Sequence, residues 1–401
     1  MSDERNHGAI MNKYILSVIF IVCGIFSLGV VANVADSSVP DPFQRFNVDS
    51  KLSIDYRDLD SLLDAVVLYT GRSNRKKASP THSATGTRMK VSVNRATVNE
   101  GNRFYFELFD GNEQNQQTLS QIRRRLENIP AVTPLERFSR DEQLAYWLNL
   151  YNVTILDEIV KVYPQRELEK MLTGKDSVLA KKTLTVAGVP LSLNDIQFTI
   201  LRQNYASNPL VIYGLYQGII GGPNIRKTAY SGKYVYADLI DNAMEFINSN
   251  RGTAGKSKKV FRVSSLYQRN TLFFGDFNAD LSQHLLTYLE GEEHDELLLA
   301  TKIKADINDW TITDLYGSQR SVSGSFSHSN AAMMGAVRGA GTASVNTTAA
   351  TVSRYSPEVL AHLQEIQRQR TKPQEKTGVV TIEELGQVTD ETDNRDGVRN
   401  N

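Results

Sequence analysis

The clearest hydrophobic pattern in the chain lies at residues 139–164, with the sequence SRDEQLAYWLNLYNVTILDEIVKVYP. Apolar residues recur every three or four positions and bulky ones also fall between them, so the segment predicts a helix that is apolar on most faces. Ser139 and Glu142 stand at the spacing of an N-terminal capping box. Such a helix is normally buried, and its amides Asn149 and Asn152 then need hydrogen-bond partners. We therefore expect this helix to organise the fold and its polar residues to hold neighbouring loops.

Shorter patterns surround this helix. The run 208–216 is apolar and bounded by turn residues, which predicts a buried strand, and the glycines at 218–222 predict a tight turn. Alternation predicts further strands at 52–56, 89–93, 104–108 and 259–263, and a hairpin at 182–193. Helical spacing predicts a short helix that follows the first of these strands and ends at 68. It also predicts helices at 117–128, 194–203, 236–250 and 281–289. The pattern predicts an α+β fold: a single domain at 52–315 with a central buried helix and a small mixed or antiparallel sheet.

Two regions depart from this globular pattern. Residues 71–86 carry Arg72, Arg75, Lys76 and Lys77 among serines and threonines, and they predict a basic loop inserted with a hairpin at about 70–110. We expect a solvated loop there rather than a site for an anionic partner, because no aromatic residues are interleaved with the charges. Residues 316–401 are rich in small and polar residues and predict a largely disordered tail with a short helix at 357–370.

The N-terminus predicts export. Lys13 precedes an uncharged apolar run at 14–31, and small residues follow it. Residues 1–35 therefore form either a cleaved signal peptide or an uncleaved membrane anchor, and 36–51 form a linker. Both alternatives predict an exported protein that is periplasmic or anchored to the inner membrane facing the periplasm. The only cysteine, Cys23, lies inside this run.

The overall composition narrows the class of partner. The 401 residues include 45 acidic and 45 basic side chains, and this balance argues against nucleic acid as a partner. Apolar residues make up 40% of the chain, which is enough for a real core.

The central helix also resembles the signature of the family known as domain of unknown function 547. The residues that carry the resemblance are Asp141, Glu142, Ala145, Tyr146, Trp147, Asn149, Tyr151 and Asn152. Later blocks at 191–202 and 208–223, and the pair Asp309 and Trp310, resemble further family motifs in the same order. The resemblance spans about 52–315, and it implies a papain- or transglutaminase-like arrangement with a cysteine and a histidine in the 208–223 block.

This chain departs from the family pattern at those positions. The expected histidine falls on Ile212, and the two expected cysteines fall on Gln217 and Gly222. None of these can act as a nucleophile or a base, and Cys23 lies in the export segment. Thiol catalysis is therefore excluded for the mature domain.

Other chemistry has weak candidates. Glu142 and Asp195 would serve as an acid–base pair if the fold brought them together, although both are expected to cap helices. We expect His284 to have a surface or packing role rather than a catalytic one, and the acidic segment around His294 to be a solvated loop. No metal or cofactor is predicted, because ligand-rich spacing is missing. A groove for a ligand is predicted at Tyr213, Tyr216, Gln217, Gly221, Gly222 and Arg226.

Three functional hypotheses remain open, one of which is a membrane-tethered scaffold whose helix at 357–370 binds a partner. The other two concern the domain at 52–315. The first is a non-catalytic binding or interaction domain of the cell envelope, derived from a cysteine-hydrolase-like fold, with a peptide, glycan or protein as ligand. The alternative is a hydrolase of peptide or amide bonds that uses a constellation without cysteine.

Overall fold

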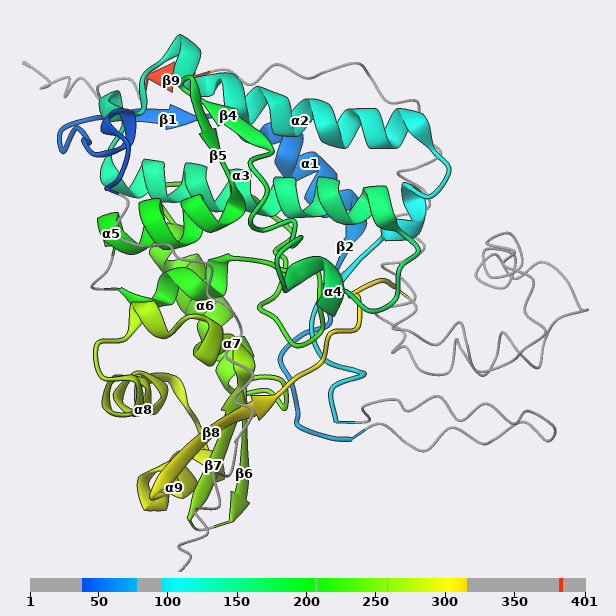
Figure 1. Cartoon of the computed structure of the whole chain (residues 1–401), viewed down its shortest axis with the longest axis vertical. Helices are drawn as coiled ribbons and strands as arrows, with labels where there is room; N and C mark the ends of the chain where they lie inside the picture. The colour runs from blue at the N-terminus through cyan, green and yellow to red at the C-terminus, as the bar shows by residue number, and fades with distance from the viewer. Residues whose placement is uncertain (1–37, 78–95, 206–207, 258, 316–381, 385–401) are drawn as a thin grey trace, which may run out of the picture.

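Helix α3 (Arg140–Val162) is the central element of the molecule (Figure 1), as its apolar pattern predicts. Most of its side chains are buried, and it packs between α2 (Glu113–Val132) and α6 (Val235–Ile247). Its first turn is capped by Ser139, whose Oγ accepts a hydrogen bond from the backbone N–H of Glu142 at 3.2 Å. A helix buried on nearly every side fixes the position of every segment that touches it.

The computed structural model describes residues 38–77, 96–205, 208–257, 259–315 and 382–384. The predicted export segment, the strand at 89–93, most of the tail and its helix at 357–370 lie outside these residues. The remaining helices are α1 (Arg57–Val66), α4 (Glu169–Leu172), α5 (Arg202–Tyr205), α7 (Ser265–Arg269), α8 (Phe277–Tyr288) and α9 (Glu292–Leu299). A π-helical segment, Asp195–Leu201, leads into α5. Within the part described, no helix has the length and apolar character needed to cross a bilayer.

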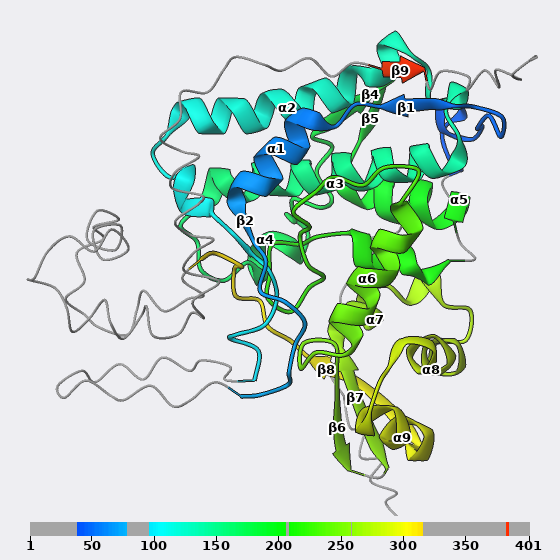
Figure 2. The ribbon, with the colours of Figure 1, turned by 180° about the vertical axis from the view of Figure 1, so that it is seen from behind.

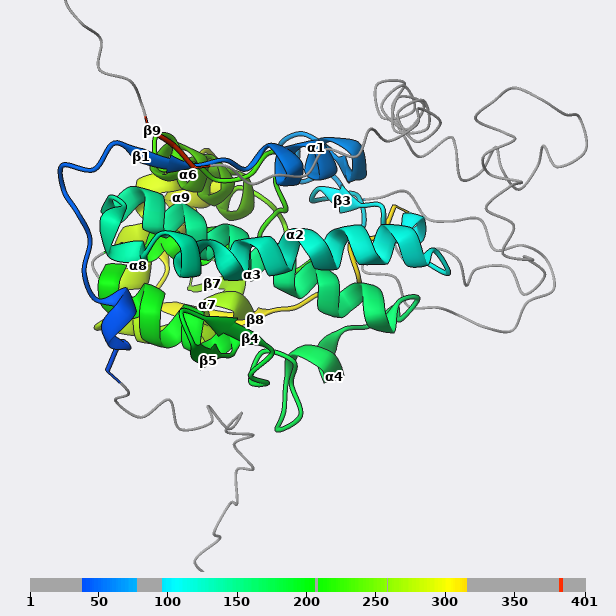
Figure 3. The ribbon, with the colours of Figure 1, turned by 90° about the horizontal axis from the view of Figure 1, so that it is seen from above.

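The strands form small sheets, and the fold is α+β as predicted. A mixed three-stranded sheet joins β6 (Thr253–Ser257), β7 (Val260–Ser264) and β8 (Lys302–Ile307), with β6 antiparallel and β8 parallel to β7. β4 (Leu184–Val186) and β5 (Val189–Leu191) form the hairpin expected at 182–193. Figures 2 and 3 show this hairpin and α1 on opposite sides of the α2–α3 pair.

Two strand pairs join segments that are distant in the sequence. β2 (Val67–Leu68) pairs with β3 (Arg103–Phe104), and a 3₁₀ turn at Phe106–Leu108 replaces the longer strand predicted at 104–108. The prediction was wrong there because consecutive aromatic residues are all buried, without alternation between two faces. β1 (Leu52–Ile54) pairs antiparallel with β9 (Ile382–Glu384), so this short part of the expected tail contributes a strand.

The run predicted as a buried strand at 208–216 is instead a 3₁₀ helix, Pro209–Gly214. It is buried as expected, but Pro209 occupies its first turn, where a fixed φ and a missing N–H favour a helix start. Asn208 caps it by accepting from the Leu210 N–H at 3.1 Å. A short apolar run carries no periodicity that separates the two structures, which explains the wrong prediction.

Candidate functional site

Asn149 and Asn152 of α3 hold two loops by pairing with their backbones. The Asn149 amide donates to the Tyr230 carbonyl at 2.8 Å and accepts from the Tyr230 N–H at 2.9 Å. Asn152 donates to the Gly214 carbonyl and accepts from the Tyr216 N–H, both at 2.9 Å. All these groups are buried, so each amide satisfies polar backbone that water cannot reach. The prediction that polar residues of this helix hold neighbouring loops is confirmed.

Glu142 joins two segments that are far apart in the sequence. Its Oε1 accepts from the Ile54 N–H at 2.9 Å, and its Oε2 accepts from the Gly232 N–H at 3.0 Å. The carboxylate therefore does not complete a reciprocal capping box with Ser139. Burial raises the pKa of Glu142, and the two backbone donors oppose this shift. A Cβ on Gly232 would lie 2.5 Å from Oε2, so the approach of this loop requires glycine.

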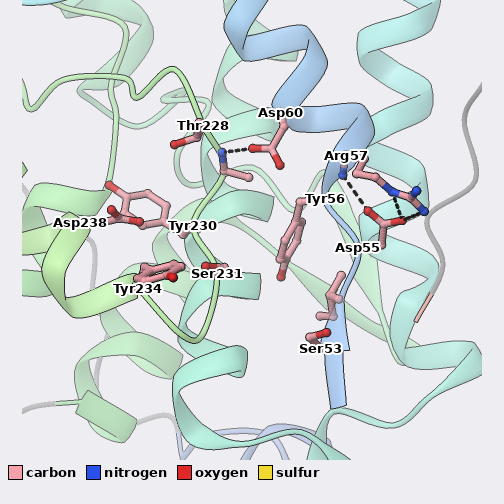
Figure 4. Close-up of a pocket in the computed structure, with 12 residues that line it drawn as sticks. Ser53, Asp55, Tyr56, Arg57, Asp60, Thr228, Tyr230, Ser231, Tyr234 and Asp238 are labelled. Carbon is pink, nitrogen blue, oxygen red and sulfur yellow. Dashed lines mark hydrogen bonds and ion pairs between the residues drawn. The ribbon is translucent and has the colours of Figure 1, made fainter. Parts of the chain in front are cut away.

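These anchors build a cleft of about 550 Å³ between the β1–α1 segment and the 228–238 segment (Figure 4). Its volume is within the usual range for sites that bind small ligands. The lining residues are Ser53, Ile54, Asp55, Tyr56, Arg57, Asp60, Thr228, Ala229, Tyr230, Ser231, Tyr234 and Asp238. Among them are hydroxyls, carboxylates and tyrosine rings, and none is His, Cys or Lys.

The charged residues of the cleft already have partners within the chain. Asp55 pairs with Arg57, whose Nε lies 2.7 Å from Oδ2. Asp238 accepts from Arg226 at 2.5 Å, and Oδ1 of Asp60 accepts from the Ala229 N–H at 2.7 Å. Burial raises the pKa values of Asp60 and Asp238. The cleft is thus acidic and polar, with preorganised walls.

The groove predicted around Tyr213 is part of the core. The Tyr213 side chain is fully buried, and its hydroxyl lies 2.9 Å from Nε2 of His284 and 3.2 Å from the Tyr267 hydroxyl. The Tyr216 hydroxyl is bonded to Thr313 Oγ1. The His284 ring stacks on Tyr213 and burial lowers its pKa to about 4. Of the two roles expected for it, surface or packing, His284 has the packing role.

The rest of that block is also packed against other elements. Gln217 accepts from Arg269 at 2.9 Å, and the Arg269 guanidinium lies 4.7 Å from the centroid of the Trp310 ring. The Gly221 N–H donates to the Asp309 carbonyl at 2.8 Å. The carbonyl of Gly222 accepts from the buried Arg251 at 2.9 Å. These contacts leave no open groove at the predicted positions, and only Arg226 lies near the cleft, as the partner of Asp238.

The predicted carboxylate pair does not form. Asp195 accepts from the N–H and the hydroxyl of Ser192 at 2.7 and 2.6 Å, and Ser192 Oγ accepts from the Asp195 N–H in return. Asp195 thus caps its own helix, while Glu142 bridges two loops elsewhere. Trp147 and Tyr151 of the helix signature are fully buried, and an edge-on contact places the Trp147 ring 5.0 Å from that of Phe43.

Two charged segments differ from their predictions. Arg75, expected in a solvated loop, donates to the carbonyls of Ile247, Ser249 and Thr253 at 2.8–3.3 Å and so covers the C-terminal end of α6. The acidic segment around His294 opens α9, where carboxylates in the first turn favour a helix start. Within the described ranges no three His, Cys, Asp or Glu residues gather as metal ligands would.

The match to a known family covers the centre of this architecture. Residues 135–247 match the family described as "Protein of unknown function, DUF547", and this part of the chain is a member of that family. The match includes α3 with its anchoring residues, the buried 208–223 block and the 228–238 wall of the cleft. Searches of curated proteins and of solved structures found no match.

The cleft residues on β1 and α1 were not predicted from the sequence. Asp60 and Ala229, which touch across the cleft, are 169 positions apart. Glu142 is the residue that joins the two walls. Its spacing from Ser139 is already explained by a helix cap, so the sequence offered no reason to expect contacts with distant segments.

Proposed function

We propose that this is an exported cell-envelope protein whose DUF547 domain is non-catalytic and binds a ligand in the cleft between α1 and the 228–238 segment. The observation that carries this proposal is the state of the cleft itself. Its walls are fixed by Glu142 and Asn149, and its carboxylates are bonded to neighbours. A rigid, polar, half-enclosed surface without a nucleophile held against a base favours recognition over reaction.

The sequence of the 208–223 block supports the loss of an ancestral reaction. A papain- or transglutaminase-like ancestor would have used a thiol and an imidazole there, and this chain has Gln217, Gly222 and Ile212 at those positions. Gln217 and Ile212 are buried, so they stabilise the core. On this proposal the binding surface lies on the neighbouring cleft, which the same central helix supports.

Export rests on the N-terminal pattern. Lys13 followed by an uncharged run at 14–31 supports either a signal peptide or an anchor. Fractionation of cells that express the full chain, followed by N-terminal sequencing, tests this part. A protein recovered from the cytosol with an intact N-terminus would refute export.

A thermal-shift screen with peptides and oligosaccharides tests the binding function, because a ligand that prefers the folded state raises the melting temperature. Tyr234 lines the cleft and is 54% exposed, so Tyr234→Ala should abolish the shift at little cost in stability. Tyr69 is 58% exposed and does not line the cleft, which makes Tyr69→Ala the matched control. A ligand whose shift is insensitive to Tyr234→Ala would place binding elsewhere.

A hydrolase of peptide or amide bonds is the alternative, and one observation favours it. Burial raises the pKa values of Asp60 and Asp238, and such carboxyl groups can act as general acids beside the hydroxyls of Ser53, Thr228 and Ser231. Turnover of a fluorogenic peptide that is lost in Asp60→Asn would establish this alternative and overturn the non-catalytic role.

A further inference from the structure

Strand β1 has its donors satisfied by the domain along one edge and meets β9 along the other (Figure 2). The N–H of Ile54 donates to Glu142 Oε1 at 2.9 Å, and the N–H of Leu52 donates to Ser50 Oγ at 3.2 Å. Main-chain groups of a strand point alternately to its two edges, so those of Ser53 point the opposite way. The edge to which they point is the one that β9 covers.

The register of the two strands specifies which residue of β9 bonds to this edge. Ser53 lies opposite Glu383 in the antiparallel pair. Because the Ile54 N–H is used by Glu142, Ser53 and Glu383 form the hydrogen-bonded pair of the ladder, and the pairs on either side are non-hydrogen-bonded. The N–H of Glu383 therefore points toward β1, whereas the N–H of Glu384 points to the outside.

The pairing is short for the length of chain that it closes. β1 and β9 share three residue pairs, and the chain reaches β9 only through the connection at 316–381. The entropy lost on closing a loop rises with the length of the loop, and a ladder of this size has few hydrogen bonds to offset the loss. Elements with few contacts open locally more often than the whole domain unfolds. We therefore expect β9 to leave and rejoin the edge of β1.

We propose that this edge of β1 is a strand-addition site, which β9 fills from within the chain and which an extended peptide segment of another protein fills when β9 leaves. The seated β9 shows what fits, namely an antiparallel segment whose backbone bonds to Ser53. Main-chain hydrogen bonds give such an added strand its affinity, and alternate side chains give it specificity. Ile382 lies opposite Ile54 in the register, so the segment should carry a branched apolar residue at that position.

A second copy of this chain is the weaker candidate for the partner. Its β9 has the same sequence as the tethered β9, whose effective concentration is on the order of a millimolar or less. A second copy would have to approach that concentration to compete. A different protein can instead offer an extended segment longer than the three residues of β9, and it would then displace β9 at lower concentration.

Two proline variants of the full chain test the occupancy of the edge. Glu383→Pro removes the N–H that points to Ser53, so β9 should leave and amide hydrogen exchange at Ser53 should accelerate at least about tenfold. Glu384→Pro is the matched control, because an edge strand tolerates proline where the N–H faces outward, and exchange at Ser53 should stay slow. Exchange at Ile54 should be slow in both variants, since Glu142 holds its N–H.

A labelled peptide with the sequence of residues 378–386, GVVTIEELG, tests binding at the open edge by fluorescence anisotropy. It should bind the Glu383→Pro chain at least about tenfold more tightly than the unaltered chain, in which β9 competes. Saturation with the peptide should restore slow exchange at Ser53. A peptide that itself carries Glu383→Pro should not bind, whereas one that carries Glu384→Pro should bind.

The strand-addition site and the proposed cleft ligand can be separated. Ser53 and Ile54 line the cleft, but the added strand uses the main chain of β1 rather than the cleft space. Tyr234→Ala alters the cleft and should leave the affinity for the peptide unchanged. A loss of peptide binding in that variant would place the peptide in the cleft and overturn the strand-addition site, while the binding function of the cleft would stand.

Four further results would overturn the inference. Unchanged exchange at Ser53 in Glu383→Pro would show that β9 does not cover this edge. Equal effects of the two proline substitutions would refute the alternation of bonded positions. Rapid exchange at Ser53 without peptide binding at several millimolar would show that the bared edge is not a binding site. A dimer of the unaltered chain at micromolar concentration in analytical ultracentrifugation, lost in Glu383→Pro, would assign the edge to a second copy and refute the class of partner.

Discussion

Asn149→Ala tests whether α3 holds the wall of the cleft. The substitution removes two hydrogen bonds, of 2.8 and 2.9 Å, to the carbonyl and N–H of Tyr230. Asn149 and Tyr230 are each 2% exposed, so the freed backbone groups stay buried. An orphaned buried group costs about 1–3 kcal/mol. Two such groups predict a loss of about 3 kcal/mol in the free energy of unfolding, toward the low end because water can enter the space left by the side chain.

Urea denaturation followed by circular dichroism measures the global loss, and amide hydrogen exchange measures where it acts. In Asn149→Ala, exchange in the 228–232 segment should accelerate by about 100-fold, since every 1.4 kcal/mol is a factor of ten. Asn152→Ala is the matched control, because it removes the same number of bonds from Gly214 and Tyr216. It should leave 228–232 slow. A loss below about 0.5 kcal/mol, with unchanged exchange in 228–232, would refute the anchoring role.

Three further predictions follow from buried contacts. His284 is neutral in the folded state because burial lowers its pKa from 6.5 to about 4, whereas the unfolded chain binds a proton below pH 6.5. The free energy of unfolding should therefore fall by up to about 3 kcal/mol as the pH is lowered from 6.5 to 4. Urea denaturation at several pH values measures this fall, and it should be absent in His284→Phe. Gly232→Ala should cost about 1–3 kcal/mol and weaken ligand binding, because its Cβ would lie 2.5 Å from the Glu142 carboxylate. Gly275→Ala should cost less in the same denaturation assay, because the nearest atom to its Cβ, Oδ2 of Asp280, lies 3.2 Å away. Arg75→Ala should lower the free energy of unfolding in urea by about 2 kcal/mol, because the carbonyls at the end of α6 lose their hydrogen-bond donor. Lys76 is exposed, so Lys76→Ala should change the free energy of unfolding by under about 0.5 kcal/mol. Equal effects of the two substitutions would refute the role of Arg75.

The sequence predicted two kinds of element correctly: long ones with a clear hydrophobic period, and short ones that carry their own turn signal. The central helix was predicted within two residues of α3, and the hairpin at 182–193 was found with its turn at Ala187 and Gly188, both with positive φ. The role of Asn149 and Asn152 also followed, because a buried amide has few alternatives to pairing with backbone.

The site depended on contacts that no local pattern specifies. Pro209 begins a helix in a run that reads equally well as a strand. From the sequence, Tyr213 and Tyr216 predicted the lining of a ligand groove. In the structure their hydroxyls form hydrogen bonds inside the core, with Tyr267 and Thr313. The cleft itself needs Asp60 and Ala229 to meet across 169 positions, and only the folded chain supplies that proximity.

The pairing of β1 with β9 has a practical consequence for work on this protein. Residues 135–247, the span of the family match, lack β1, and a fragment that stops at residue 315 lacks the strand that covers its edge. Ser53 and Ile54 of β1 are both wall residues of the cleft and register partners of Glu383 and Ile382. A shortened protein would thus expose bare main-chain donors and acceptors beside the ligand, inviting intermolecular strand addition and self-association. Recombinant versions meant for binding studies should retain the chain through Glu384.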